Sequence, residues 1–242
     1  MGSQKSDRPA VGIRAVLAAA AATGRRYWAR ILVVAVAVSL VTAVAEILVD
    51  EFVDRNDVPV AIFADLSASV VSLLGAVFLS GFICKLASAE EHDADAMPVR
   101  QVLRALPWAR LIGADLLVAL LVAVGLLLLV LPGLIAINLF GIVGPVIEIE
   151  NRPVIAALRR SARLVRSHFW TVALLVTVPV VLSGELDALV SLPDSPLAIA
   201  ENLAIRGIVE AVVEAAIALV VVKLGRRLMD LDRVTASVPA VN

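Results

Sequence analysis

Three charged residues recur at intervals of four along the last apolar segment of the chain: Arg206, Glu210 and Glu214. Residues four apart share one face of a helix. In a membrane Glu214 would lie near the bilayer midplane, where an ionised carboxylate costs at least ~2.5 kcal/mol unless it is paired, hydrated or protonated. One interpretation is a polar path for a proton, a cation or a basic substrate, joined by Asp65, Glu46 or Asn138 from other spans. The other, which we favour, is an internal Arg–Glu pair that fixes helix packing, because Arg206 could neutralise Glu210 directly.

Other groupings of reactive side chains are weaker. An acidic run with one histidine could hold a divalent cation through hard oxygen ligands, but it lacks the spacing of a metal-binding loop and is interpreted as solvated: Glu90, Glu91, His92, Asp93 and Asp95. His168, beside two aromatic residues, is interpreted as an interfacial anchor. The sequence contains no catalytic triad order, phosphate loop or zinc motif. We therefore predict no catalytic residue, no metal and no cofactor, and we expect the chain not to be an enzyme.

Composition indicates the kind of element that carries these residues. The chain is 61% hydrophobic and has a mean hydropathy of +0.97, whereas soluble domains are usually ~45–50% apolar. Charged residues make up 18% and cluster between apolar runs. Cys84 is the only cysteine, which excludes an intrachain disulfide. Residues 1–242 are therefore predicted to form one polytopic membrane domain.

The apolar runs predict an all-α integral membrane protein with six transmembrane helices arranged as three hairpins. The predicted spans are about 31–49, 59–86, 111–131, 133–147, 169–182 and 203–222. Pro132 and Gly133 are predicted to break the helix between the third and fourth spans, and Pro145 to interrupt the fourth.

Basic residues predict the orientation. With residues 1–30 and 223–242 in the cytoplasm, only Arg55 and Arg206 of the 21 lysines and arginines fall outside or in the outer half of the bilayer. This bias follows the positive-inside rule. We expect a multi-pass protein of the bacterial cytoplasmic membrane with both termini inside.

A basic amphipathic stretch, an elbow, precedes each predicted hairpin. In the third, Pro153 opens a helix in which an apolar stripe faces away from four arginines. The stripe comprises Ile155, Leu158, Ala162, Val165 and Phe169, and the arginines are Arg159, Arg160, Arg163 and Arg166. Anchoring to anionic lipid head groups explains such a face, at ~1 kcal/mol per basic residue. The alternative is docking of a cytoplasmic partner or a single head group.

Tryptophans mark the same place in each unit: Trp28, Trp108 and Trp170 stand where an odd-numbered span leaves the cytoplasmic face. An amphipathic indole ring favours that position. Together with Pro9, Pro98 and Pro153 at the start of the elbows, they predict an internal repeat of three units.

One stretch resembles a known signature. Its residues are Pro132 and Gly133, then Pro145, Val146 and Ile147 with Glu150, then Ala157 to Ser161, and finally Phe169 and Trp170. It resembles the membrane domain that precedes the catalytic domain in some bacterial glycerophosphodiester phosphodiesterases, and related stand-alone membrane proteins. The resemblance implies a six-helix membrane domain. It does not imply phosphodiesterase activity, which belongs to a separate metal-dependent soluble barrel.

Two classes of function remain open. The first is a non-catalytic scaffold or accessory subunit for a membrane or lipid-related process. The second is a small transporter or lipid-handling permease that uses the carboxylates of the sixth span. The expected partners are the lipid bilayer, anionic lipid head groups, and either another membrane protein or a second copy of the chain; nucleic acid is not expected.

Overall fold

Helices make up every regular element that the structure describes. The computed structural model describes residues 12–52, 58–91, 98–182 and 196–237, and no strand occurs in these ranges. The elements are α1 (Ile13–Phe52), α2 (Val58–Glu91), α3 (Val99–Ala105), α4 (Trp108–Leu128), α5 (Val130–Phe140), α6 (Val143–Glu150), α7 (Val154–Arg166), α8 (Phe169–Val172), the π-helical η1 (Ala173–Thr177) and α10 (Pro196–Ser237). The all-α class predicted from the sequence is confirmed.

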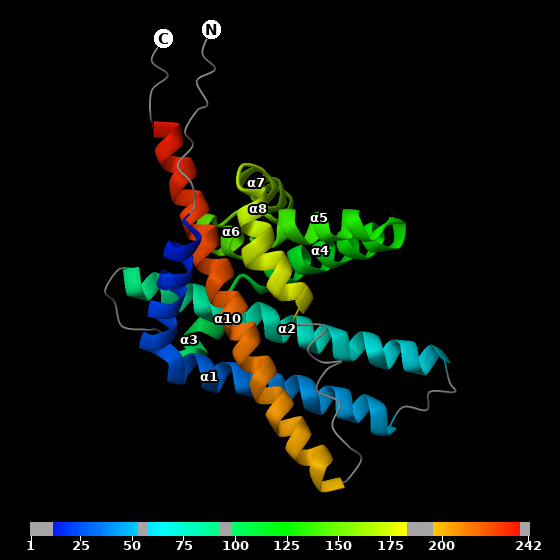
Figure 1. Cartoon of the computed structure of the whole chain (residues 1–242). Helices are drawn as coiled ribbons and strands as arrows, with labels where there is room; N and C mark the ends of the chain where they lie inside the picture. Colours follow the sequence, from blue (N-terminus) through cyan, green and yellow to red (C-terminus); the bar gives the residue numbers. More distant parts are fainter. Residues whose placement is uncertain (1–11, 53–57, 92–97, 183–195, 238–242) are drawn as a thin grey trace.

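Helices α1 and α2 lie side by side, and α10 crosses both of them diagonally (Figure 1). Gly75 lets α1 and α2 approach closely, because a Cβ atom there would lie 2.6 Å from Val38 Cγ1. The start of α1 lies beside the end of α10 (Figure 1). The described ends of the chain therefore lie on the same side of the helical assembly.

Within the described residues, three helical segments are long and apolar enough to cross a membrane: Ile13–Ala45, Trp108–Gly125 and Val130–Glu150. Val154–Arg166 and Phe169–Leu182 make a fourth if that pair, bent by 104°, counts as one span. The spans expected over 59–86 and 203–222 fall in α2 and α10, and six spans stay a prediction.

The break between the third and fourth predicted spans is not at Pro132 and Gly133, as the sequence suggested. The chain turns at Leu129, which is extended with φ −168° and ψ 148°, and both residues lie in the first turns of α5. Proline is tolerated in a first turn because the N–H groups there have no intrahelical acceptor, but its ring would clash with the carbonyl four residues earlier. Pro132 therefore stops α4 at Leu128.

Pro145 acts in the same way. It lies in the first turn of α6, and the interruption falls before it, at Ile142, with φ −108° and ψ 14°. The backbone of Gly133 packs against Gly125 of α4, where a Cβ atom would lie 2.8 Å from the Gly133 nitrogen. The α4–α5 hairpin is therefore held by close contact between two backbones.

Each tryptophan follows a bend between an amphipathic segment and an apolar helix. Tyr27 interrupts α1 with φ −116° and ψ 15°, directly before Trp28. Pro107 separates α3 from α4, which begins at Trp108. The third bend lies between α7 and α8, just before Trp170. The three bends fall where the sequence placed the elbows, and the repeat of whole units stays a prediction.

The buried face of α7 includes only part of the apolar stripe that the sequence predicted. Ala157, Leu158, Arg160, Ser161, Leu164 and Val165 are buried. Ile155, expected in the apolar stripe, is 53% exposed. Arg160, expected on the outward basic face, is the correction that matters most, because a buried guanidinium requires partners.

Candidate functional site: a polar hub around helix α10

The C-terminal half of α10 carries polar side chains that bond to several other helices. The cluster, which we call the polar hub, consists of Thr23, Ser88, Glu90, Glu150, Arg160, Lys223, Arg226 and Asp232. Buried apolar residues of the same stretch hold this half of α10 against the core: Leu224, with Leu228 and Met229 four and five residues further along the same face. The sequence treated residues after Lys223 as a polar terminus. The structure shows one helix up to Ser237.

Glu90 joins three helices. Its Oε2 atom lies 2.9 Å from Nζ of Lys223 in α10 and also accepts a hydrogen bond from the Thr23 hydroxyl of α1. Burial raises the pKa of Glu90, but hydrogen bonds from Lys223 and Thr23, and the charges of Lys223 and Arg26, outweigh burial and hold the pKa below its usual value. Glu90 therefore belongs to the last turn of α2 and is not part of a solvated acidic loop; His92, Asp93 and Asp95 lie outside the described residues.

Arg226 lies one turn further along α10 and is buried. Its Nη2 atom donates to the backbone carbonyl of Cys84, at 3.1 Å, and to the Ser88 hydroxyl. Ser88 also donates to the Cys84 carbonyl, at 3.0 Å. The guanidinium thus binds the last two turns of α2 through one hydroxyl and one carbonyl.

The third part of the hub is the buried ion pair of α6 and α7. Arg160 donates from Nη2 to Oε1 of Glu150 at 3.1 Å, and from Nη1 to Oδ2 of Asp232 at 2.7 Å. Arg152 adds a second cation, with Nε 2.5 Å from Oε2 of Glu150. The side chains of Arg160 and Glu150 are only 11% and 8% exposed. Such charge-assisted, nearly desolvated pairs are directional and depend on every partner being present.

A residue in the left-handed backbone conformation brings Glu150 and Arg160 together. Asn151 ends α6 with φ 50° and ψ 40°, a conformation that asparagine tolerates better than most residues. Nη1 of Arg110 holds the turn by donating to Oδ1 of Asn151 at 2.6 Å. Pro153 then caps α7, so that Glu150 and Arg160 face one another across a short turn.

Polar groups of the apolar helices lie near the hub. Nδ2 of Asn138 in α5 donates to the Phe169 carbonyl at 3.1 Å, and the Ser161 hydroxyl donates to the Leu139 carbonyl at 2.7 Å. Among the described residues, Oδ1 of Asn138, Oε2 of Glu148 and Oγ1 of Thr177 are buried without a hydrogen-bond partner. Buried acceptors of this kind are the places where water or a ligand group would bind.

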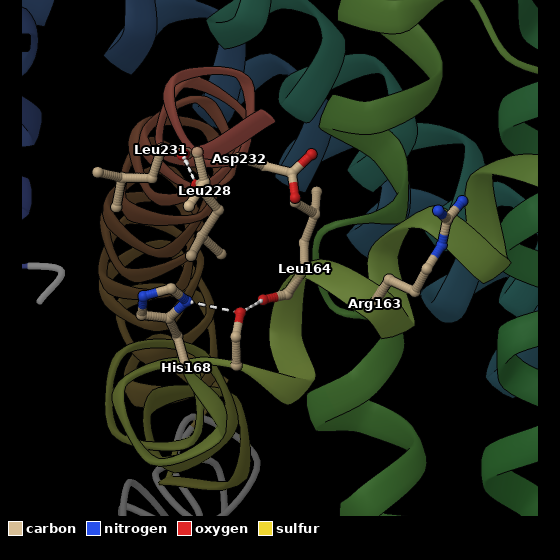
Figure 2. A pocket seen from close by; sticks show the side chains of 8 residues that line it. Arg163, Leu164, His168, Leu228, Leu231 and Asp232 are labelled. Atoms are coloured by element: carbon tan, nitrogen blue, oxygen red, sulfur yellow. Dashed lines mark hydrogen bonds between the residues drawn. The ribbon is translucent and has the colours of Figure 1, made fainter. Parts of the chain in front are cut away.

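A hollow of about 360 Å³ opens between α7 and the end of α10, and Asp232 is one of the residues that line it (Figure 2). Ser167 donates to the Leu164 carbonyl at 2.9 Å and lies 2.9 Å from Nδ1 of His168. The Arg163 guanidinium points away from the hollow (Figure 2). Leu164 of α7 and Leu228 and Leu231 of α10 also line the hollow. Its lining therefore combines apolar side chains with polar ones.

Glu210 and Glu214, two of the intramembrane candidates from the sequence, lie outside the polar hub. Glu210 is exposed and Glu214 is half-buried on the N-terminal half of α10, away from the hub. The side chains of Arg206 and Asp65 lie outside the described residues. Arg159, Arg163 and Arg166 are exposed, as the basic elbow predicts, whereas Arg160 is not.

The tryptophans differ in their surroundings. Trp28 and Trp170 are 65% and 82% exposed. Trp108 is half-buried: it stacks on Phe78 at a ring-centroid distance of 6.1 Å, and its Nε1 donates to the Leu103 carbonyl at 2.7 Å. Trp28 and Trp170 have the exposure expected of interfacial anchors, and Trp108 fixes α3 against α4.

Lys223, Arg226 and Asp232 are not among the site residues that the sequence predicts. A signal for them was present, because Leu224, Leu228 and Leu231 mark an apolar face that continues past the predicted end of the sixth span. Several residues of the stretch that resembles a family signature also meet here. Glu150 pairs with Arg160, and Pro145 packs against α10, where a Cβ atom on Gly225 would lie 3.1 Å from Pro145 Cβ.

Comparison of the chain with protein-family models, with curated proteins and with solved structures gives no match.

Proposed function

We propose that the chain is a non-catalytic scaffold or accessory subunit of the bacterial cytoplasmic membrane, with six spans and both termini in the cytoplasm. The observation that carries the proposal is the polar hub, in which charged side chains of α2, α6, α7 and α10 bond one another. A charge that a helix uses to hold its neighbour is not available to bind a substrate. The arrangement therefore favours a fixed helical assembly that presents its outer surfaces to lipid and to a partner.

The start of α1 and the end of α10 lie on the same side of the helical assembly (Figure 1). This arrangement supports an even number of spans. Exposed arginines on α7 and exposed tryptophans after two bends support the placement of the elbows at the inner leaflet. The resemblance of residues 131–170 to a six-helix membrane domain agrees with this arrangement.

A second function, a small transporter or lipid-handling permease, is favoured by a different observation. Asn138, Glu148 and Thr177 bury polar atoms without hydrogen-bond partners within apolar helices, and α5 and α6 are separated by a break. Interrupted helices with inward polar groups are typical of transporters.

Substitution of Glu210 and Glu214 by glutamine in proteoliposomes distinguishes the two functions. The probe is proton uptake under an imposed membrane potential, read with an internal pH dye. A scaffold gives no uptake above empty liposomes, for the wild type or for the double variant. Proton uptake by the wild type that Glu210→Gln and Glu214→Gln abolish, with the protein still incorporated, would overturn the scaffold proposal.

A further inference from the structure

The outward side of α7 carries three exposed arginines at successive turns, which we call the basic face: Arg159, Arg163 and Arg166. At ~100° per residue they fall, together with the exposed Ile155, within an arc of about 80°. Arg160 falls outside this arc, among the buried residues of the helix. The four arginines of α7 therefore divide into one that is used inside the protein and three that point out of it.

The charge of the basic face is not neutralised within the described residues. The two carboxylates that bond to α7, Glu150 and Asp232, are both paired with Arg160. No hydrogen bond or ion pair joins Arg159, Arg163 or Arg166 to another described residue, and the Arg163 guanidinium points away from the hollow that Asp232 lines (Figure 2). Like charges three and four residues apart repel one another, so an anionic partner from outside would stabilise this face.

The position of α7 indicates where that partner comes from. Val154–Arg166 is bent by 104° from Phe169–Leu182. Because the second segment is a span under the proposed function, α7 lies close to the plane of the bilayer surface. It also lies at the edge of the helical assembly (Figure 1).

Exposed apolar groups at both ends of α7 favour lipid over a soluble acidic protein. Ile155 is 53% exposed, and Trp170, just past the bend, is 82% exposed. A basic helix flanked by an exposed aliphatic side chain and an exposed indole is suited to the boundary between head groups and acyl chains. The partner that covers all of these groups is a lipid surface with anionic head groups.

We propose that the basic face of α7 binds the phosphate groups of anionic phospholipids in the inner leaflet, and that Arg160, although it belongs to the same run of arginines, takes no part. The proposal rests on the membrane location under the proposed function and adds to it a lipid class and the residues that select it. Arginine binds phosphate oxygens through paired N–H groups. Zwitterionic lipids carry a phosphate too, but their amine cancels its charge, so the basic face should prefer a head group with a net negative charge.

Quenching of Trp170 fluorescence by brominated lipids tests the proposal at the basic face itself. Trp28→Phe and Trp108→Phe leave Trp170 as the only tryptophan. This parent is placed in mixed vesicles in which either phosphatidylglycerol or phosphatidylcholine carries dibrominated chains, and brominated phosphatidylglycerol should quench more strongly. Arg163→Gln and Arg166→Gln should each lower that preference about fivefold, until the two lipids quench equally. Arg163→Lys keeps the charge and should retain most of the preference.

The matched control removes two charges from other helices. Arg25 in α1 and Arg104 in α3 are exposed, and the Arg25→Gln, Arg104→Gln double variant should keep the preference of the parent. An unchanged preference in the Arg163→Gln, Arg166→Gln double variant would overturn the proposal. An equal loss in the control would also overturn it, because the effect would then follow the net charge and not the basic face.

The same measurement separates this proposal from the proposed function. Strong but equal quenching of the parent by the two lipids would contradict only the lipid preference and would assign the basic face to an acidic protein. Absence of quenching by both lipids would contradict the placement of the elbows at the inner leaflet, and the proposal would fail with it.

Discussion

The polar hub and the α4–α5 hairpin are stabilised in opposite ways. In the hub, directional bonds between charged groups join helices that are far apart in the chain, such as Lys223 and Glu90. In the hairpin, no polar side chain occurs between Asp115 and Asn138, and the tip is exposed, with Leu127 at 88%. Close contact between Gly125 and the backbone of Gly133 holds the two helices together near this tip. One protein thus uses specific pairing at one end and close backbone contact at the other.

This difference shows what each region can tolerate. A buried ion pair has no substitute when one partner is lost, because the remaining charge stays desolvated. An exposed leucine in an apolar hairpin can be replaced by many apolar residues, because it makes few contacts with the rest of the protein. Substitutions in the two regions test this contrast when the free energy of unfolding of each variant is measured by detergent titration in mixed micelles.

Arg160→Ala should have the largest effect. It leaves Glu150 buried with Arg152 as its remaining cation, and loss of one partner from a buried pair costs about 3–5 kcal/mol. Arg163→Ala is the control, since Arg163 is exposed three residues along the same helix and should change the free energy by less than about 0.5 kcal/mol. Equal effects of the two substitutions would show that the hub does not hold the assembly.

Gly125→Ala should destabilise the hairpin by about 1–3 kcal/mol, the usual cost of overpacking. The new Cβ atom would lie 2.8 Å from the backbone nitrogen of Gly133, and a backbone atom cannot move aside as a side chain can. At Gly207 a Cβ atom meets nothing within 4 Å. Gly207→Ala should therefore be neutral or stabilising, by up to about 1 kcal/mol.

The Glu90–Lys223 pair should make stability depend on pH in the acid range. The pKa of Glu90 is lower in the folded chain than its value of 4.5 in a free side chain. The stabilisation is therefore complete above that unfolded value and is lost as the pH falls through the lowered folded pKa. The free energy of unfolding of Glu90→Gln should fall less with acidification than that of the wild type. Parallel profiles for the two proteins would exclude the pair as a source of stability.

Leu128→Ala should have the smallest effect, below about 0.5 kcal/mol, because the side chain lies exposed at the hairpin tip. The same substitution at Leu228, which is buried in the hub half of α10, should cost about 2–5 kcal/mol. Similar losses at the two leucines would mean that the tip is packed against protein.

The sequence predicts the features that are local in the chain. Hydropathy predicts the helical class, and proline and tryptophan together mark the three bends. The positions of the breaks were wrong by a few residues at Pro132 and Pro145, because a proline ends the helix before it and is itself accepted in the next first turn. Proline in the sequence therefore predicts that a helix breaks nearby more reliably than it predicts the residue at which the helix breaks.

Most of the hub could not be predicted, because its partners are distant in the chain; the sequence favours Glu148 and Glu150 as partners of the basic elbow, but it does not single out Arg160. Arg160 and Asp232 are 72 residues apart, and Arg160 looks equivalent to Arg159, Arg163 and Arg166 by charge and periodicity. Only the turn at Asn151 places Arg160 opposite Glu150. Residue type alone does not give the buried face of α7 either, because Ile155 of the predicted stripe is exposed whereas Ser161 is buried.

The most direct test of the account is the sidedness of the two ends of the chain. Alkaline phosphatase, active only outside the cytoplasm, and green fluorescent protein, fluorescent when it folds inside, would each be fused in turn to each terminus in a bacterial inner membrane. The account predicts fluorescence and no phosphatase activity at both ends, as an even number of spans with the elbows on the inner leaflet requires. Phosphatase activity at one end and fluorescence at the other would contradict it.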